Sequence, residues 1–290
     1  MLEQKEKEQV HENEKVVTRR KFLLTAGALA TGLIATGITG CSTSEPAKTA
    51  ATGNTDAAET KTNTNGPAPA LPWKYKKIDV DKVRKRGYEN YFKYGCMYAA
   101  ASALLTTLAE DNGTPWDTIP LDMFQYGAAG AYGWGTLCGA LNGSLAVINL
   151  ASAKHAEIGN ELIGWYTKFP FPSNKHEAYC HFKNQVTTVS DSPLCHVSVS
   201  KWAAAAGARI NEKAKKDRCA KLSGDTAARA AELLNEALEK GAIVATYKVP
   251  DEFSHCMSCH QSEKSLLDNE QGKMDCLYCH GDHTKTGKKQ

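Results

Sequence analysis

The chain has 290 residues and a formal net charge of +3 at pH 7, with 23% charged residues and ten cysteines. This length suits one domain with an additional segment. The near-neutral charge lacks the basic excess of nucleic-acid-binding domains, so we expect no nucleic-acid partner. The cysteine count makes disulfides, metal ligands or cofactor attachment the chemistry to examine.

The first 41 residues resemble an export signal. Arg19 and Arg20 precede Phe22, Leu23 and a soft apolar run to residue 40 that is rich in Gly, Ala and Thr. Paired arginines before such a run are typical of twin-arginine signals. The run is too weakly hydrophobic for a convincing spanning helix. Because that route carries proteins that fold before transport, it also hints at a cofactor inserted in the cytoplasm.

The end of this signal resembles a lipoprotein box, Ile38-Thr39-Gly40-Cys41. In that interpretation Cys41 carries a lipid anchor. The alternative is a signal anchor that stays uncleaved. In either case we expect the chain to leave the cytoplasm for the periplasm or the cell surface, and both alternatives would attach it to the membrane.

Residues 42–72 read as a flexible linker, because they contain Thr, Ala, Asn, Gly, Pro and Ser, with a few charges and almost no large apolar residue. Such a composition buries too little apolar surface to offset chain entropy. We therefore expect a helical, cysteine-containing domain at 73–245 and a C-terminal segment at 246–290.

The first part of that domain contains three predicted helices. Apolar and small residues recur at helical spacing over Tyr88–Ala109, Leu137–Ala153 and His155–Lys168. Within the second run, Gly139 and Gly143 leave a bare groove on one helix face. This groove would allow close approach of another helix or of an inorganic cluster.

The second part is less regular. Residues 169–195 contain three prolines and read as irregular. Asp225 suits the N-cap of a helix over Thr226–Lys240, and Gly241 suits its C-cap. Ala242–Val249 has strand-like composition, although it could equally be a linker. The predicted fold class is mainly α, with a C-terminal segment of low secondary-structure content.

The C-terminal segment contains two C-x-x-C-H sequences, which begin at Cys256 and Cys276 and end at His260 and His280. This pattern is the attachment signature of c-type haem, although four cysteines at this spacing could also hold one zinc ion. Zinc would not need a histidine after each pair. The segment also has few large apolar residues of its own, and two porphyrins would supply the missing apolar surface.

We therefore predict two covalent c-type haems per chain. Cysteines at i and i+3 share one face of a helical turn, and the next histidine lies where it can bind iron. The predicted thioether residues are Cys256, Cys259, Cys276 and Cys279. His260 and His280 are the predicted proximal ligands.

Each haem iron has a second axial position. His255 and His283 lie beside the two motifs, and His155 begins the third predicted helix. These three are the candidate distal ligands. A pair of histidine ligands would give a lower reduction potential than a histidine–methionine pair.

Five further cysteines lie in the domain: Cys96, Cys138, Cys180, Cys195 and Cys219. In an exported protein, spare cysteines ordinarily form disulfides. Thiolates also hold iron–sulfur clusters. Either arrangement leaves one of the five over, so the count does not decide between them.

A family resemblance rests on the string Cys138-Gly139-Ala140-Leu141-Asn142-Gly143. With Cys96 upstream and Cys195 and Cys219 downstream, it resembles a redox-active family named for its cysteine pattern. Followed by two C-x-x-C-H motifs, it resembles the split-Soret cytochromes c over about residues 73–283.

That resemblance implies a mainly helical homodimer with two stacked c-type haems per subunit and a [2Fe–2S] centre. A distal histidine could come from the partner subunit. By the same resemblance Cys96, Cys138, Cys195 and Cys219 are the cluster ligands. Cys180 lies outside the family's four and is the alternative to Cys96 or Cys195.

The function expected from these features is electron transfer between the cluster, the haem pair and a redox partner protein, without catalysis. The alternative is a multihaem reductase of a small nitrogen or oxygen species, which would require one open haem site. Nothing in the sequence resembles the output domain of a sensor.

Overall fold

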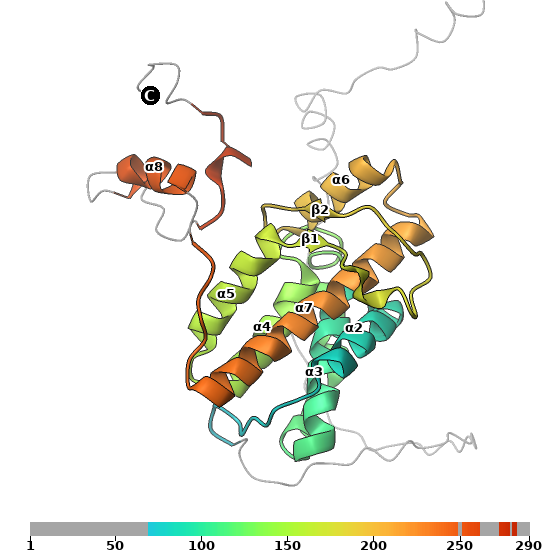
Figure 1. Ribbon diagram of the computed structural model, residues 1–290, viewed down its shortest axis with the longest axis vertical. Helices are drawn as coiled ribbons and strands as arrows, with labels where there is room; N and C mark the ends of the chain where they lie inside the picture. The colour runs from blue at the N-terminus through green and yellow to red at the C-terminus, as the bar shows by residue number, and fades with distance from the viewer. Residues whose placement is uncertain (1–68, 249–250, 262–272, 279, 283–290) are drawn as a thin grey trace, which may run out of the picture. The chain divides into compact units, whose positions relative to one another are not determined.

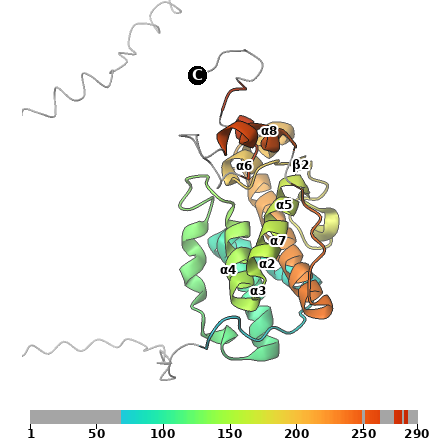
Figure 2. The ribbon, with the colours of Figure 1, turned by 90° about the vertical axis from the view of Figure 1, so that its left-hand side faces the viewer.

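The computed structural model describes residues 69–248, 251–261, 273–278 and 280–282. The expected signal, Cys41 and all but the last four residues of the expected linker lie outside the described residues. Figures 1 and 2 show the described helices from two directions. None of the described helices is long and apolar enough to cross a membrane.

The described chain is mainly helical, with only one short pair of strands, which confirms the predicted mainly α class. The α-helices are α2 (Val80–Tyr94), α3 (Cys96–Asn112), α4 (Gly139–Ala151), α5 (His155–Lys168), α6 (Cys195–Ala206), α7 (Lys213–Lys240) and α8 (Asp251–His260). The 3-10 helices are η1 (Trp116–Thr118), η2 (Leu121–Gly127), η3 (Asn174–His176) and η4 (Cys276–Tyr278).

The core of the domain lies between α2, α3, α4, α5 and α7. Helix α7 packs against the other four, and α3 packs against α2, α4 and α7. The buried face of α3 is nearly continuous, because the helix carries small and aliphatic residues all round. A helix of this kind is stable only when other elements surround it.

The predicted helix over Tyr88–Ala109 is in fact two helices, and the break falls at Gly95. Gly95 has a φ of +82°, a conformation that side chains rarely adopt, and a Cβ at this position would lie 2.9 Å from the Cβ of Ala128. The chain turns here, so Cys96 becomes the first residue of α3. The sequence pattern missed this break because both helices are apolar on their inner faces.

Helix α4 approaches α3 closely at the two glycines noted in the sequence. A Cβ on Gly143 would lie 2.4 Å from the carbonyl oxygen of Met97, and a Cβ on Gly139 would lie 2.5 Å from the Sγ of Cys96. Real Cβ atoms do not come this close to other atoms. The predicted bare groove is therefore filled by the first turns of α3.

Helix α7 begins at Lys213, 13 residues before the predicted start at Thr226. Asp225 lies inside the helix and is 4% exposed, so its predicted role as an N-cap is wrong. Its carboxylate instead accepts hydrogen bonds from Ser173 and stands 2.9 Å from Nε2 of His176. Gly241 ends the helix with a φ of +71°, which confirms the predicted C-cap.

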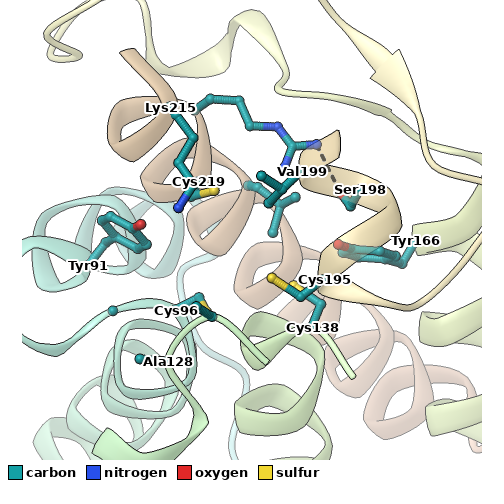
Figure 3. A pocket seen from close by; sticks show the side chains of 14 residues that line it. Tyr91, Cys96, Ala128, Cys138, Tyr166, Cys195, Ser198, Val199, Lys215 and Cys219 are labelled. Carbon is teal, nitrogen blue, oxygen red and sulfur yellow. Dashed lines mark hydrogen bonds between the residues drawn. The ribbon is translucent and has the colours of Figure 1, made fainter. Parts of the chain in front are cut away.

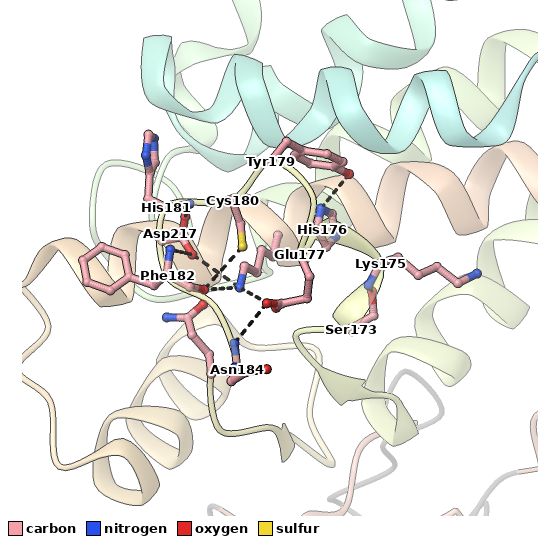
Figure 4. Close-up of polar contacts among 12 residues, drawn as sticks. Ser173, Lys175, His176, Glu177, Tyr179, Cys180, His181, Phe182, Asn184 and Asp217 are labelled. Carbon is pink, nitrogen blue, oxygen red and sulfur yellow. Dashed lines mark hydrogen bonds and ion pairs between the residues drawn. The ribbon is translucent and has the colours of Figure 1, made fainter.

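The irregular stretch 169–195 is fastened to α7 and α2 by buried polar groups. Its only strands, β1 (Pro170–Phe171) and β2 (Thr188–Val189), pair antiparallel, with Pro170 opposite Val189. Figure 4 shows Asp217 of α7 bound to the backbone N–H groups of His181 and Phe182. Because buried charges are costly without partners, these contacts hold the loop in one position.

The predicted strand at Ala242–Val249 is wrong over its described part, 242–248, which is irregular. Thr246 donates to Glu161 through its backbone N–H at 2.9 Å and through its hydroxyl, and Tyr247 donates through its N–H at 3.0 Å. These donors are satisfied by one carboxylate on α5 and need no partner strand.

We predict that Gly143→Ala destabilises the domain by about 1–3 kcal/mol, because the new methyl group would push α4 away from α3. Gly159→Ala is the matched control on α5. There a Cβ would meet only the mobile end of Leu145, at 3.0 Å, and alanine favours the helix. Denaturant unfolding of both variants measures the difference. Equal stability of the two variants would contradict a tight contact between α3 and α4.

A second prediction concerns pH. Burial raises the pKa of Glu161, but hydrogen bonds from Thr246 and Tyr247 and the charge of Arg229 outweigh it, so the pKa is lowered overall. A lowered pKa in the folded state means that the ionised carboxylate stabilises the fold. This stabilisation is complete above the unfolded pKa of about 4.3 and is lost as pH falls through the lower folded pKa.

We therefore expect Glu161→Gln to cost about 1.5–3 kcal/mol at pH 7, the usual value of hydrogen bonds to a charged group. The difference between this variant and the unsubstituted chain should shrink as pH falls below about 4. Unfolding curves at several pH values measure it. Glu157→Gln, on the exposed first turn of the same helix, should change little, and a pH-independent effect of Glu161→Gln would refute the assignment.

Candidate metal centre and haem segment

Four cysteines from four separate helices line one cavity of about 110 Å³. Figure 3 shows their side chains around it, together with the rings of Tyr91 and Tyr166. The four cysteines are Cys96, Cys138, Cys195 and Cys219. These are the four that the sequence pattern singled out as cluster ligands.

Three of the four cysteines stand at helix N-termini. Cys96 is the first residue of α3, Cys138 is the N-cap of α4, and Cys195 is the first residue of α6. Cys219 comes from the second turn of α7. The N-terminus of a helix carries a partial positive charge and unpaired N–H groups. Three such ends directed at one cavity favour an anionic group inside it, thiolates included.

Backbone pairing holds two of the cysteines beside each other. Cys138 N–H donates to the carbonyl of Pro193 at 2.9 Å, and Cys195 N–H donates to the carbonyl of Thr136 at 2.7 Å. Leu137 and Leu194 form an isolated antiparallel bridge between the same segments. The segments before α4 and α6 are thus tied together directly at the cavity.

Two of the four cavity thiols, those of Cys96 and Cys195, have raised pKa values. Hydrogen bonding with Cys138, together with burial, raises the pKa of Cys96 well above its usual value. Burial raises the pKa of Cys195 to about 12. A raised pKa favours the protonated thiol, so a metal that binds Cys96 and Cys195 would have to displace protons from them.

Two buried polar groups at the cavity lack hydrogen-bond partners among the described residues. One is the hydroxyl of Tyr166, and the other comprises Nε and Nη1 of Arg218. Both side chains are at most 1% exposed, and both line the cavity. The Nη2 of Arg218 donates to Ser198 at 2.9 Å, the bond dashed in Figure 3. Lys215 also lines the cavity, so the wall carries two cations and no carboxylate.

This donor set fits a polynuclear iron–sulfur group. Four thiols match the four cysteine ligands that such clusters use, and the unpaired donors match its negative charge. Within the described part of the chain, no three His, Cys, Asp or Glu side chains lie close enough to hold a single metal ion. A cavity separates the thiols, which suits a group larger than one ion.

Cys180 lies away from this cavity. It is half-buried in the loop before β2, and its thiol donates to the carbonyl of Phe182 at 3.5 Å. Figure 4 places it among the polar contacts of that loop. All five cysteines of the domain are free thiols, so the structure forms none of the disulfides that the sequence left open.

Part of the expected haem segment is described. Cys256, Cys259 and His260 lie on α8, so the first motif has the helical spacing expected of a haem attachment site. Cys276 begins η4, and His280 N–H donates to its carbonyl at 2.9 Å. Burial and the neighbouring Cys256 raise the pKa of Cys276. Cys279 lies outside the described residues.

The candidate distal histidines are only partly described. His155 is exposed at the start of α5. His283 and the side chain of His255 lie outside the described residues. His176 is fully buried, and its two ring nitrogens contact Asp225 and Tyr179. Both nitrogens are therefore already engaged by partners within the domain.

Sequence reasoning missed the groups around the four thiols. Arg218 precedes Cys219, but an arginine in a helix rich in Lys and Arg carries no special signal. Helix α6 was not predicted either, because the prolines before it suggested irregular structure. The convergence of helix ends is a property of the tertiary fold.

We next compared the chain with known protein families and with known proteins. Residues 98–233 match the family described as "Putative redox-active protein (C_GCAxxG_C_C)", a stretch that contains three of the four cavity cysteines and starts two residues after Cys96. The split-Soret cytochrome c of Desulfovibrio desulfuricans is 32% identical over 229 residues, which cover 76% of this chain and 81% of that protein.

A solved structure of the split-Soret cytochrome c from Desulfovibrio desulfuricans, described as having a novel iron centre, superposes with a TM-score of 0.67 at 30% identity. The match covers 74% of this chain and 93% of that one. The sequence identity over most of both chains and the shared fold show that the chain belongs to the split-Soret cytochrome c family.

Proposed function

We propose that this protein is an exported electron-transfer cytochrome with two c-type haems and a [2Fe–2S] centre held by Cys96, Cys138, Cys195 and Cys219. Membership of a redox-active cytochrome family supports electron transfer in general. The observation that carries the finer proposal is the cavity, which is lined by four thiols, three of them at helix N-termini, and by a guanidinium whose Nε and Nη1 lack partners among the described residues.

When bound, the centre and the haems would each accept and release single electrons. The chain's own part is to hold and tune them. The four cysteines supply the ligands, and the buried wall excludes water. The unpaired hydroxyl of Tyr166 and the guanidinium of Arg218 are placed to donate hydrogen bonds to sulfur. Such bonds are among the factors that set the potential of an iron–sulfur centre.

A chain of aromatic rings runs from the cavity towards the linker before the haem segment. Tyr166 lines the cavity, and its ring centre lies 4.9 Å from that of Phe171. Phe171 in turn packs at 5.5 Å from Trp165 and 4.9 Å from Phe169. Trp165 and Phe169 line a groove together with Tyr247, which precedes Cys256 by nine residues. This array supports a route for electrons between the centre and the haems.

The proposal includes export by the twin-arginine-type signal to the periplasm or cell surface, with a lipid anchor at Cys41 or an uncleaved signal. It also includes a homodimer and a separate redox partner protein. Tyr132 and Trp134, 81% and 82% exposed, support a protein contact close to the cavity, because large exposed aromatic rings are common at interfaces.

We predict that Cys195→Ser removes most of the non-haem iron and acid-labile sulfide from the purified protein, because serine replaces a thiolate ligand. The matched control is Cys180→Ser, which changes a half-buried thiol of the same domain outside the cavity. Iron and sulfide should stay at the unsubstituted level in that control. Equal loss in the two variants, or no sulfide in the unsubstituted protein, would refute the cluster.

A further prediction tests the haems and the alternative function. The exported protein should contain two covalent haems per chain, and Cys256→Ala or Cys276→Ala should each leave one. Optical spectra and mass spectrometry give the count. Rapid binding of carbon monoxide to the reduced protein would reveal an open haem site and would favour a reductase over an electron carrier.

A further inference from the structure

Arg218 is a buried arginine that has no carboxylate partner among the described residues. Its side chain is 1% exposed, on the second turn of α7, and it lines the cavity with the four cysteines. Nη2 donates to the neutral hydroxyl of Ser198, while Nε and Nη1 have no partner among the described residues. No described carboxylate lies within 4.0 Å of it. A buried cation in this state is costly.

The acidic residue next to Arg218 does not compensate this charge. Asp217 is buried too, but its carboxylate is already engaged by the hydroxyl of Tyr88 at 2.5 Å and by Nζ of Lys221 at 3.5 Å. It also accepts the backbone N–H groups of residues 181 and 182. Neighbouring positions on a helix point in different directions, so Asp217 faces the loop and Arg218 faces the thiols.

Arg84 shows how this fold treats a buried arginine that serves the structure alone. It is 4% exposed on α2, and its guanidinium faces three carboxylates. Asp225 and Glu232 each lie at 3.7 Å, and Asp81 is closer still. The fold therefore supplies acids where a buried arginine must be neutralised within the protein. It supplies none for Arg218.

We propose that the negative charge of the metal centre is the counter-ion of Arg218, and that Arg218 raises the centre's reduction potential. This inference rests on the proposed cluster. Four thiolates and the bridging sulfides of a [2Fe–2S] group carry more negative charge than two ferric ions neutralise. One-electron reduction, with the electron supplied by a chemical reductant, adds one more negative charge and no proton. A buried guanidinium nearby stabilises the reduced form more than the oxidised form.

Substitution of Arg218 should have opposite effects on the stability of the protein with and without the bound centre. Without the centre, Arg218 is an uncompensated buried charge, so Arg218→Met should raise the midpoint temperature of unfolding. With the centre bound, the same substitution removes a counter-ion. The loaded variant should then lose iron to a chelator faster, and its centre should have a more negative midpoint potential.

The experiment compares Arg218→Met with Arg84→Met in the full-length protein, each with its centre intact and after removal of the centre by a chelator. Arg84→Met should lower the unfolding midpoint in both states and leave the potential of the centre unchanged, because its carboxylate partners are present in both. Arg218→Lys keeps the positive charge but loses the forked guanidinium donor. The midpoint potential of its centre should therefore stay close to that of the unsubstituted protein. Potentials are read by optical and electron paramagnetic resonance titration with dithionite.

The outcomes separate the two proposals. If the unsubstituted protein contains no non-haem iron and no sulfide, the cluster itself is refuted. If the cluster is present but Arg218→Met lowers stability in both states and leaves the potential unchanged, Arg218 is an ordinary structural residue and the inference fails. Opposite stability effects in the two states, with a more negative potential, support it.

Discussion

The close approach of α4 to the first turns of α3 is the constraint on which the candidate site depends. Gly139 and Gly143 carry no Cβ, so the backbone of α4 can lie against Met97 and against the thiol of Cys96. A side chain at either glycine would separate the two helices and move Cys138 away from Cys96. Cys195 is held at the cavity by the backbone pairing before α6, and Cys219 is held there by the packing of α7 on α3.

Electrostatics and burial act against each other in this cavity. The ends of α3, α4 and α6 and two basic side chains favour negative charge, yet the pKa of Cys96 is raised by its hydrogen bond with Cys138 and by burial, and burial raises the pKa of Cys195. The protein without a metal therefore holds cations that its own groups do not neutralise. Ordinary core packing would not select such an arrangement, whereas an anionic inorganic group would resolve it.

The sequence predicted the features that depend on a repeating pattern of residues or on a single local residue. The amphipathic period placed α5 to the residue, and Gly241 marked the end of α7. The resemblance to a family named for its cysteine pattern identified the four residues that line the cavity. The break at Gly95 and the buried role of Asp225 depend on tertiary contacts instead. Arg218 was missed for the same reason, since its importance lies in the partners it lacks.

The spacing of the four cysteines along the chain has a consequence for how the protein is assembled. Cys96 and Cys219 lie 123 residues apart, and the helices between them must already be packed before the thiols meet. A link that closes a loop of about 100 residues removes about 4.7 kcal/mol of chain entropy from the unfolded state at 25 °C. A cluster bonded to all four cysteines would thus bind after the helices have packed. It would then stabilise the folded domain against unfolding.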